Sequence, residues 1–323
     1  MDYKDLIKLD QKDYEILREL DYDFSSSFSK IGKKVKLSKN SVALRYDKLK
    51  KVLLHNLVGI NTKKIGYTEI KVYYSFDFFN EESEKQIKKE MIKYKNIVWA
   101  ARYYGNYDLC ILFLVDNIND FIIQLNRFNQ KFAAKINQKD IEIVSKAYYF
   151  RYNFLHEKSI PDYVLIKESE KPIKLTEIDR KLLKIMRFEP RISIIQLAEK
   201  LNLSPKTVSN KIKDLENKKI ITGYFISLDC SKFNHQTFNL LIQLKNHKIE
   251  NDFEKYIIGM KNIKYIEKMT GTWDYQIDMI YPNMLELQKK IESIKENFPN
   301  AIKKLAILSF GKRIATNKDN YPI

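Results

Sequence analysis

The sequence predicts an α+β protein built from two similar halves, each with a winged helix-turn-helix unit followed by a ferredoxin-like βαββαβ domain. Three observations lead to this fold class. Motifs recur at a constant offset of 166 residues, a short turn joins two helical patterns early in each half, and strand and helix patterns alternate over the remainder.

The repeat is clearest in three pairs of motifs. They are Leu9-Asp10-x-x-Asp13 with Leu175-Thr176-x-x-Asp179, Leu37-Ser38 with Leu203-Ser204, and Gly105-Asn106-Tyr107-Asp108 with Gly271-Thr272-Trp273-Asp274. Because the three pairs share one offset over most of a half, they indicate an internal duplication.

Composition and charge limit the classes of protein to which this chain can belong. The chain has 323 residues and 58 Lys and Arg side chains against 41 Asp and Glu, which gives a formal net charge of +17. The length predicts two or more domains, the 44% hydrophobic content is typical of a folded globular protein, and the longest apolar run, 109–115, is too short to cross a bilayer. Since the polar start has no signal-peptide pattern, we expect a cytoplasmic protein.

The cysteine and histidine positions predict neither a metal site nor a cofactor. Cys110 and Cys230 are far apart, only four His are present, and no spacing resembles a zinc site. We expect two free thiols and no cofactor, although the sequence alone leaves a disulfide open.

Capping residues define the helices of each helix-turn-helix unit. Asp10 and Thr176 are predicted N-caps of the first helices, and Ser38 and Ser204 of the third helices. Inward stripes at helical spacing follow in the third helices: Val42, Tyr46 and Leu49 in the first half, and Val208, Ile212 and Leu215 in the second. The β-rich segments 53–61 and 220–229 are predicted to be part of wings.

The remainder of each half predicts the βαββαβ order. In the first half we expect strand 68–77, helix 80–95, strands 97–104 and 107–115, helix 118–134 and strand 140–150; in the second, 236–245, 249–260, 263–270, 273–281, 283–298 and 302–310. The predicted divisions are 1–62 and 173–230 for the helix-turn-helix units, 63–154 and 231–323 for the ferredoxin-like domains, and 155–172 for the linker.

Charge is distributed unevenly over the first unit. Residues 24–60 carry nine basic side chains and one acidic one, whereas residues 1–23 carry four basic and eight acidic ones. A cationic third helix suits a nucleic-acid partner, although a Lys-rich helix is also commonly only solvated.

The solvent-facing side of each third helix provides the candidate DNA contacts. Base-edge and phosphate contacts are predicted for Lys39, Asn40, Leu44, Arg45, Lys48, Lys206, Ser209, Asn210, Lys211 and Lys213. An Asn such as Asn210 can bond the N6 and N7 atoms of adenine. Because Asn40 corresponds to Lys206 and Leu44 to Asn210, two DNA-binding halves would recognise different half-sites.

The motifs together resemble the Lrp/AsnC family of transcription regulators. The resemblance rests on Leu175, Asp179, Arg191-Ile192-Ser193, Leu197-Ala198, Leu203-Ser204, Thr207-Val208 and Gly223-Tyr224, and on the G-x-aromatic-D motif of each half. The first half departs from the pattern, with Ser25 at the place of Arg191 and Gly32 at that of Ala198. Two such units in one chain are also unusual for the family.

The resemblance implies a regulator that binds double-stranded DNA, with a small effector such as an amino acid at the domain interfaces. The candidate effector residues are Gly105, Tyr107, Asp108, Gly271, Trp273 and Asp274, in which glycine exposes backbone N–H groups and aspartate can accept an ammonium. The alternative is an ordinary tight turn whose aspartates bond local backbone.

The duplication suggests that the two C-terminal domains pair within one polypeptide as an intrachain pseudo-dimer, with further homo-oligomers possible. Two alternatives stay open. Siroheme decarboxylases resemble this architecture, but the strands after the G-x-x-D motifs contain no His. An effector-sensing module that does not touch DNA is the other alternative.

Overall fold

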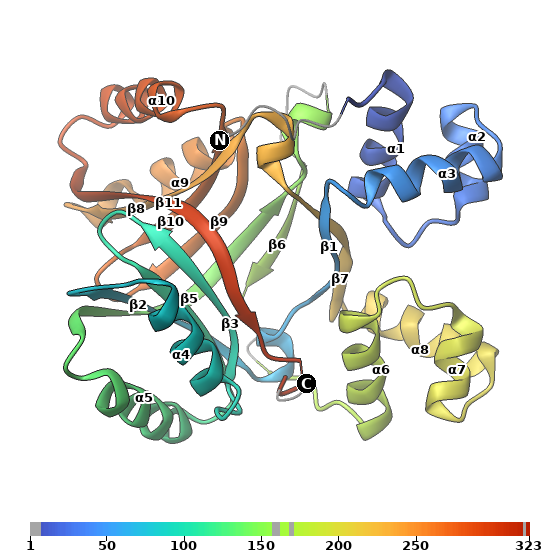
Figure 1. Ribbon diagram of the computed structural model, residues 1–323, viewed down its shortest axis with the longest axis horizontal. Helices are drawn as coiled ribbons and strands as arrows, with labels where there is room; N and C mark the ends of the chain where they lie inside the picture. Colours follow the sequence, from blue (N-terminus) through green and yellow to red (C-terminus); the bar gives the residue numbers. More distant parts are fainter. Residues whose placement is uncertain (1–7, 157–161, 168–170, 319–320) are drawn as a thin grey trace.

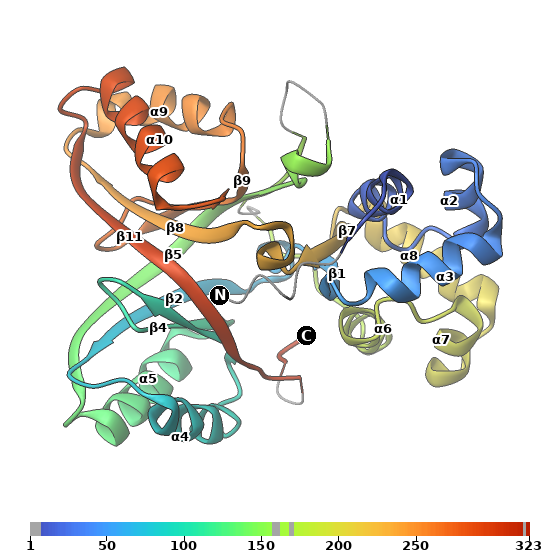
Figure 2. The ribbon, with the colours of Figure 1, turned by 45° about the horizontal axis from the view of Figure 1, so that its top comes forward.

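The computed structural model describes residues 8–156, 162–167, 171–318 and 321–323. Two helix-turn-helix units lie side by side at one end of the molecule, and the strands and helices of the two ferredoxin-like domains make up the other (Figures 1 and 2). The order of elements in the first half returns in the second, so the predicted tandem α+β fold is confirmed.

The two helix-turn-helix units have matching boundaries. The first comprises α1 (Gln11–Tyr22), α2 (Phe28–Val35) and α3 (Lys39–Leu49), and the second α6 (Glu177–Phe188), α7 (Ile194–Leu201) and α8 (Pro205–Asn217). Asp10 with Asp13 and Thr176 with Asp179 form the expected capping boxes. Lys36 and Asn202 adopt the left-handed conformation and reverse the chain between second and third helices.

The segments expected in separate wings pair with each other instead. Strand β1 (Leu53–Ile60) and strand β7 (Ile221–Leu228) form a two-stranded antiparallel ribbon, with Val58 opposite Tyr224. Helix α1 packs against β7, and α6 packs against β1, so each unit contacts the other half's strand. The ribbon therefore joins the halves.

The ferredoxin-like domains contribute four strands each to one sheet. The first has β2 (Thr68–Phe76), β3 (Ile97–Tyr104), β4 (Leu109–Val115) and β5 (Ile136–Phe150), with α4 (Glu81–Met91) and α5 (Ile118–Phe132). The second has β8 (Gln236–Leu244), β9 (Ile263–Thr270), β10 (Tyr275–Tyr281) and β11 (Ile302–Thr316), with α9 (Glu250–Ile258) and α10 (Met284–Asn297). Short 3₁₀ turns lie at 63–65, 153–155, 230–233 and 247–249.

Two long strands cross from one half to the other and close the sheet into a ring. Strand β5 pairs with β2 of its own half and β9 of the other, and β11 pairs with β8 of its own half and β3 of the other. Strand β5 begins at 136 rather than 140 because residues 136–139 continue its pairing with β2 of the same half, and β11 continues to 316 rather than 310 because its last residues pair with β3 of the other half. The helices cover the outside of the ring (Figure 2).

Side chains fill the space inside the ring. Apolar side chains from both halves form one cluster there: Tyr73, Ala101, Tyr103, Tyr107, Cys110, Val144, Leu241, Met269, Trp273, Ala306 and Leu308. A polar chain lies beside it, in which Lys71 pairs with Glu267 and also donates to Gln276 at 2.9 Å. The halves thus share an interior as well as strands.

The expected linker 155–172 contains a strand. Residues Tyr163–Lys167 form β6, which pairs antiparallel with β5, with Leu165 opposite Tyr148. Residues 157–161 and 168–170 of that prediction lie outside the described part of the chain. The connection between the halves is therefore anchored to the sheet for part of its length.

Candidate nucleic-acid interface and inter-half turns

Helix α3 separates its buried side from its exposed side as predicted. Val42, Tyr46 and Leu49 are buried. Lys39 and Asn40 are exposed at the amino end, and Leu44 is 74% exposed near the middle. The first unit thus presents a solvent-facing third helix.

Helix α8 presents the equivalent side of the second unit. Val208 and Leu215 are buried, and Ile212 is half-buried. Lys206, Asn210 and Lys213 are exposed, and Ser209 is half-buried. Both third helices therefore keep candidate DNA contacts at the surface.

Three of the cations predicted to contact DNA form ion pairs with acidic side chains of the same helix-turn-helix unit. Arg45 Nη1 lies 2.7 Å from Asp13 Oδ1 and Lys48 Nζ 2.6 Å from Asp13 Oδ2, while Lys211 Nζ lies 2.8 Å from Asp179 Oδ1. Asp13 is fully buried; its burial opposes ionisation, but the hydrogen bonds from Lys48 and Arg45 hold its pKa below the usual value. Arg45, Lys48 and Lys211 therefore dock the third helix on the first, a role missed by the sequence analysis.

An arginine of the second unit joins it to the first. Arg191 Nη1 donates to the Phe24 carbonyl oxygen at 2.8 Å, and its guanidinium lies 4.6 and 4.7 Å from the Phe28 and Tyr46 ring centroids. A cleft of about 730 Å³ opens beside it. Ser25 occupies the equivalent position of the first half, so this contact has no counterpart there.

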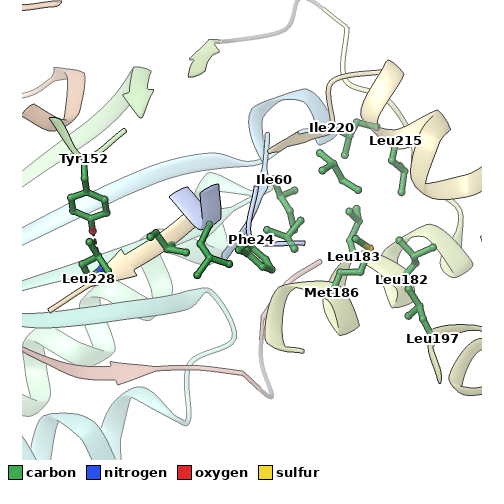
Figure 3. Close-up of a cluster of buried hydrophobic side chains, with 14 of the residues drawn as sticks. Phe24, Ile60, Tyr152, Leu182, Leu183, Met186, Leu197, Leu215, Ile220 and Leu228 are labelled. Atoms are coloured by element: carbon green, nitrogen blue, oxygen red, sulfur yellow. Dashed lines mark hydrogen bonds between the residues drawn. The ribbon is translucent and has the colours of Figure 1, made fainter. Parts of the chain in front are cut away.

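The two units share one hydrophobic core. Phe24 and Ile60 of the first half lie in the same cluster as Leu182, Leu183 and Met186 of the second, as Figure 3 shows. In the same cluster the Leu228 N–H donates to the Tyr152 hydroxyl at 2.9 Å. A shared core holds the two third helices in a fixed relative position.

The glycines of the two candidate effector turns lie against the other half's long strand. Gly105 has φ +132°, and a Cβ there would lie 2.6 Å from the Ile307 carbonyl oxygen. A Cβ on Gly271, whose φ is +158°, would overlap the Ile141 carbonyl oxygen even more closely. Since Ile141 and Ile307 are 166 residues apart, the two close approaches are equivalent.

The aspartates and aromatic residues of these turns make internal bonds. Asp108 Oδ2 accepts the Phe76 N–H at 2.8 Å and Asp274 Oδ2 the Leu244 N–H at 2.7 Å, which fits the ordinary-turn interpretation. Trp273 Nε1 donates to the Tyr107 hydroxyl at 3.0 Å, so equivalent aromatic residues of the halves meet. The structure brings Tyr107 and Trp273 together and directs Asp108 and Asp274 to backbone.

A carboxylate from the first half binds the turn of the second. Glu142 Oε1 accepts the Thr272 N–H at 3.1 Å, and Glu142 Oε2 accepts the Trp273 N–H at 3.2 Å. Burial raises the Glu142 pKa to about 7, although these two hydrogen bonds oppose the shift. The position 166 residues later is Leu308, so the Gly105 turn has no such carboxylate. No local sequence signal identifies Glu142, because its partner Thr272 lies 130 residues away.

Other predicted features have these positions. Cys110 and Cys230 are buried free thiols. His156 pairs with Asp21, and His235 bonds the Phe233 carbonyl oxygen. Over the described residues, no helix is long and apolar enough to span a membrane, and no group of three or more His, Cys, Asp or Glu is arranged to hold a metal ion.

The fold and the two exposed third helices define a tandem helix-turn-helix protein, and comparison with known proteins supports this class. Residues 9–50 match the AsnC-type helix-turn-helix domain, and residues 175–222 match a winged helix-turn-helix DNA-binding domain.

Two regulators shorter than this chain are similar to it in sequence. The HTH-type transcriptional regulator Ptr1 of Methanocaldococcus jannaschii is 30% identical over 101 residues, covering 31% of this chain and 68% of that protein. An uncharacterised HTH-type transcriptional regulator of Pyrococcus furiosus is 24% identical over 123 residues, covering 38% of this chain and 82% of its own. The chain belongs to the Lrp/AsnC family of transcription regulators, as its motifs indicated.

A two-unit solved structure is similar over nearly the whole chain. The siroheme decarboxylase NirDL aligns with a TM-score of 0.62 over 97% of this chain and 95% of its own, at 12% identity. At that identity the likeness concerns the fold alone.

Proposed function

We propose that this protein is a DNA-binding transcription regulator that acts as an intrachain pseudo-dimer in the cytoplasm. The observation that carries the proposal is the pair of exposed third helices, α3 and α8, held on one shared core. Family membership makes double-stranded DNA the expected partner.

The exposed cations supply the attraction to DNA. Lys39 in α3 and Lys206 and Lys213 in α8 are exposed and form no ion pair within the described part of the chain. Lysines of this kind bind phosphates without regard to sequence and release counterions, so binding should weaken steeply as salt rises.

Chain connectivity supports one polypeptide as the binding unit. In addition to the shared core, the β1–β7 ribbon and the crossing strands β5 and β11 join the halves. We expect sedimentation at low concentration to give a stable species of one 38.5 kDa chain, or an oligomer of it. A chain that unfolds or aggregates whenever it is diluted to single copies would contradict internal pairing.

An effector would bind one of the two Gly-x-aromatic-Asp turns. The turns at Gly105 and Gly271 differ, because Glu142 occupies the backbone N–H groups of the second. An amino-acid effector would therefore bind the Gly105 turn in preference. Titration with amino acids, followed by tyrosine and tryptophan fluorescence, tests this preference.

The enzyme alternative has weaker support. The NirDL likeness concerns the fold, and apolar side chains of both halves fill the ring interior. A clear absorbance shift on mixing the protein with a tetrapyrrole would favour the enzyme.

The main test is DNA binding of charge-reversed variants, with a site first selected from random sequences. We expect Lys206→Glu with Lys213→Glu to weaken binding at least about tenfold and to reduce the salt slope by about 2. The matched control, Lys85→Glu with Lys295→Glu, makes the same charge change on α4 and α10 at the far end and should have a small effect. Equal losses in both pairs, or none in either, would contradict a DNA interface on α8.

A further inference from the structure

Leu44 is the most exposed large hydrophobic side chain in the described part of the chain, at 74%. It lies in α3 opposite the buried side formed by Val42, Tyr46 and Leu49. A single exposed leucine is ordinary at a protein surface, but this one lies within the cationic segment 24–60, on the helix that would enter the groove. Because Leu44 is exposed on this helix, its side chain is a candidate contact to a base.

The neighbours of Leu44 are polar groups that a duplex can accommodate. Asn40 lies one turn before it and is exposed. Asp47, on the same side, pairs with Lys50 at 2.5 Å, which offsets its repulsion of phosphate. Leu44 is therefore an apolar group within an otherwise polar contact surface.

Only one feature of the major groove matches an apolar side chain. Base edges there present hydrogen-bond donors and acceptors, except for the C5-methyl group of thymine. Leucine can make no hydrogen bond through its side chain, so beside any other base it would desolvate a polar edge without compensation. The favourable partner of Leu44 is thus a thymine methyl.

The second half has a different chemical group at this position. Asn210, 166 residues after Leu44, is exposed on α8 and carries both a donor and an acceptor. The two third helices therefore differ in the kind of contact they can make, apolar in the first and hydrogen-bonded in the second.

We infer that Leu44 is a specificity-determining residue that recognises the C5-methyl group of a thymine in the half-site contacted by α3. This inference rests on the proposed DNA-binding function and extends it to one base and one half of the chain. It requires one half-site of the operator to contain a thymine whose methyl group strengthens binding only when Leu44 is present.

The test removes the methyl group from the DNA and the leucine from the protein. Each thymine of the selected site is replaced in turn by deoxyuridine, and affinity is measured for the unmodified chain and for Leu44→Ala. We expect one replacement to weaken the unmodified chain about fourfold, as for one buried methyl group, and to leave Leu44→Ala unchanged.

Two controls sharpen the result. Ile195→Ala trims another exposed apolar side chain, 62% exposed on α7, and should keep the full deoxyuridine penalty. Asn210→Ala should also keep it, because it acts on the other half-site. Salt-dependent binding with no deoxyuridine effect, or with the same effect in Leu44→Ala, overturns the inference and leaves DNA binding intact. Absence of DNA binding overturns both.

Discussion

The turns at Gly105 and Gly271 share a backbone arrangement but differ in what surrounds them. Both glycines lie against a carbonyl oxygen of the other half's long strand, at Ile307 and Ile141. The second turn also binds the buried Glu142 carboxylate, where the first faces Leu308. The duplicated halves therefore keep equivalent geometry where their backbones meet and differ where side chains decide the chemistry.

The largest expected effect on stability comes from adding a Cβ at the two turn glycines, where the backbones of the halves meet. Gly271→Ala should reduce the free energy of unfolding by about 3–4 kcal/mol, since its Cβ would overlap both Ile141 and Glu142. Gly105→Ala should cost about 2–3 kcal/mol, because only the 2.6 Å approach to Ile307 is severe. Urea denaturation measures both.

Gly259→Ala is the matched control for the glycine variants. Gly259 has φ −74°, and a Cβ there would meet neighbours at ordinary distances of 3.5 and 3.6 Å. Its stability should change by less than about 0.5 kcal/mol. Equal losses in the three variants would mean that the close approaches are unimportant.

A smaller effect on stability is expected from the Glu142 carboxyl, which binds only the second turn, and this effect depends on pH. Because the folded-state pKa of Glu142 is raised to about 7 from 4.5, the folded state binds more protons than the unfolded state between these pH values. The stability contribution of Glu142 is therefore greatest below pH 4.5 and declines by up to about 3 kcal/mol as pH rises to 7.

Glu142→Gln should remove that decline, as measured by denaturation at several pH values. The control Glu296→Gln changes an exposed acid on α10 and should retain it. Parallel pH profiles for the unmodified chain and Glu142→Gln would show that the carboxyl titrates normally.

The smallest expected effects on stability come from removing the ion pairs that hold the two third helices. Arg45→Ala should cost about 1–2 kcal/mol, because it leaves Lys48 as the only cation paired with the buried Asp13. Lys211→Ala removes one partly exposed pair with Asp179 and should cost about 0.5 kcal/mol. Thermal denaturation ranks the two variants.

The same two variants test the docking role against a phosphate-binding role. If Arg45 and Lys211 only hold their helices, the salt slope of DNA binding should stay the same in both variants. A salt slope reduced by about 1 in either variant would show that the substituted residue binds a DNA phosphate.

Local signals in the sequence were sufficient for much of the fold. Capping pairs such as Asp10 with Asp13 act within one helical turn, and the βαββαβ order follows from alternating patterns. The exposed sides of α3 and α8 followed from the same helical spacing.

Features that depend on contacts between residues far apart in the sequence could not be predicted. Periodicity indicates that 53–61 forms a strand but not that the strand pairs with 221–228, and it cannot find β6 between prolines and charges. The pairing of Arg45 with Asp13 could not be predicted, because the two residues lie 32 positions apart and no local pattern links them. Glu142 and Arg191 act across the halves, where no spacing rule applies.

The crossing strands also constrain how the chain can fold during translation. Strand β3 pairs on one side with β4, but its other neighbour is β11, whose residues 302–316 leave the ribosome long after β3 does. Until then the first half has an open strand edge, which is prone to pairing with other chains. We expect nascent chains that stop before residue 302 to need chaperones and to aggregate when released, even though strand β3 itself is already complete.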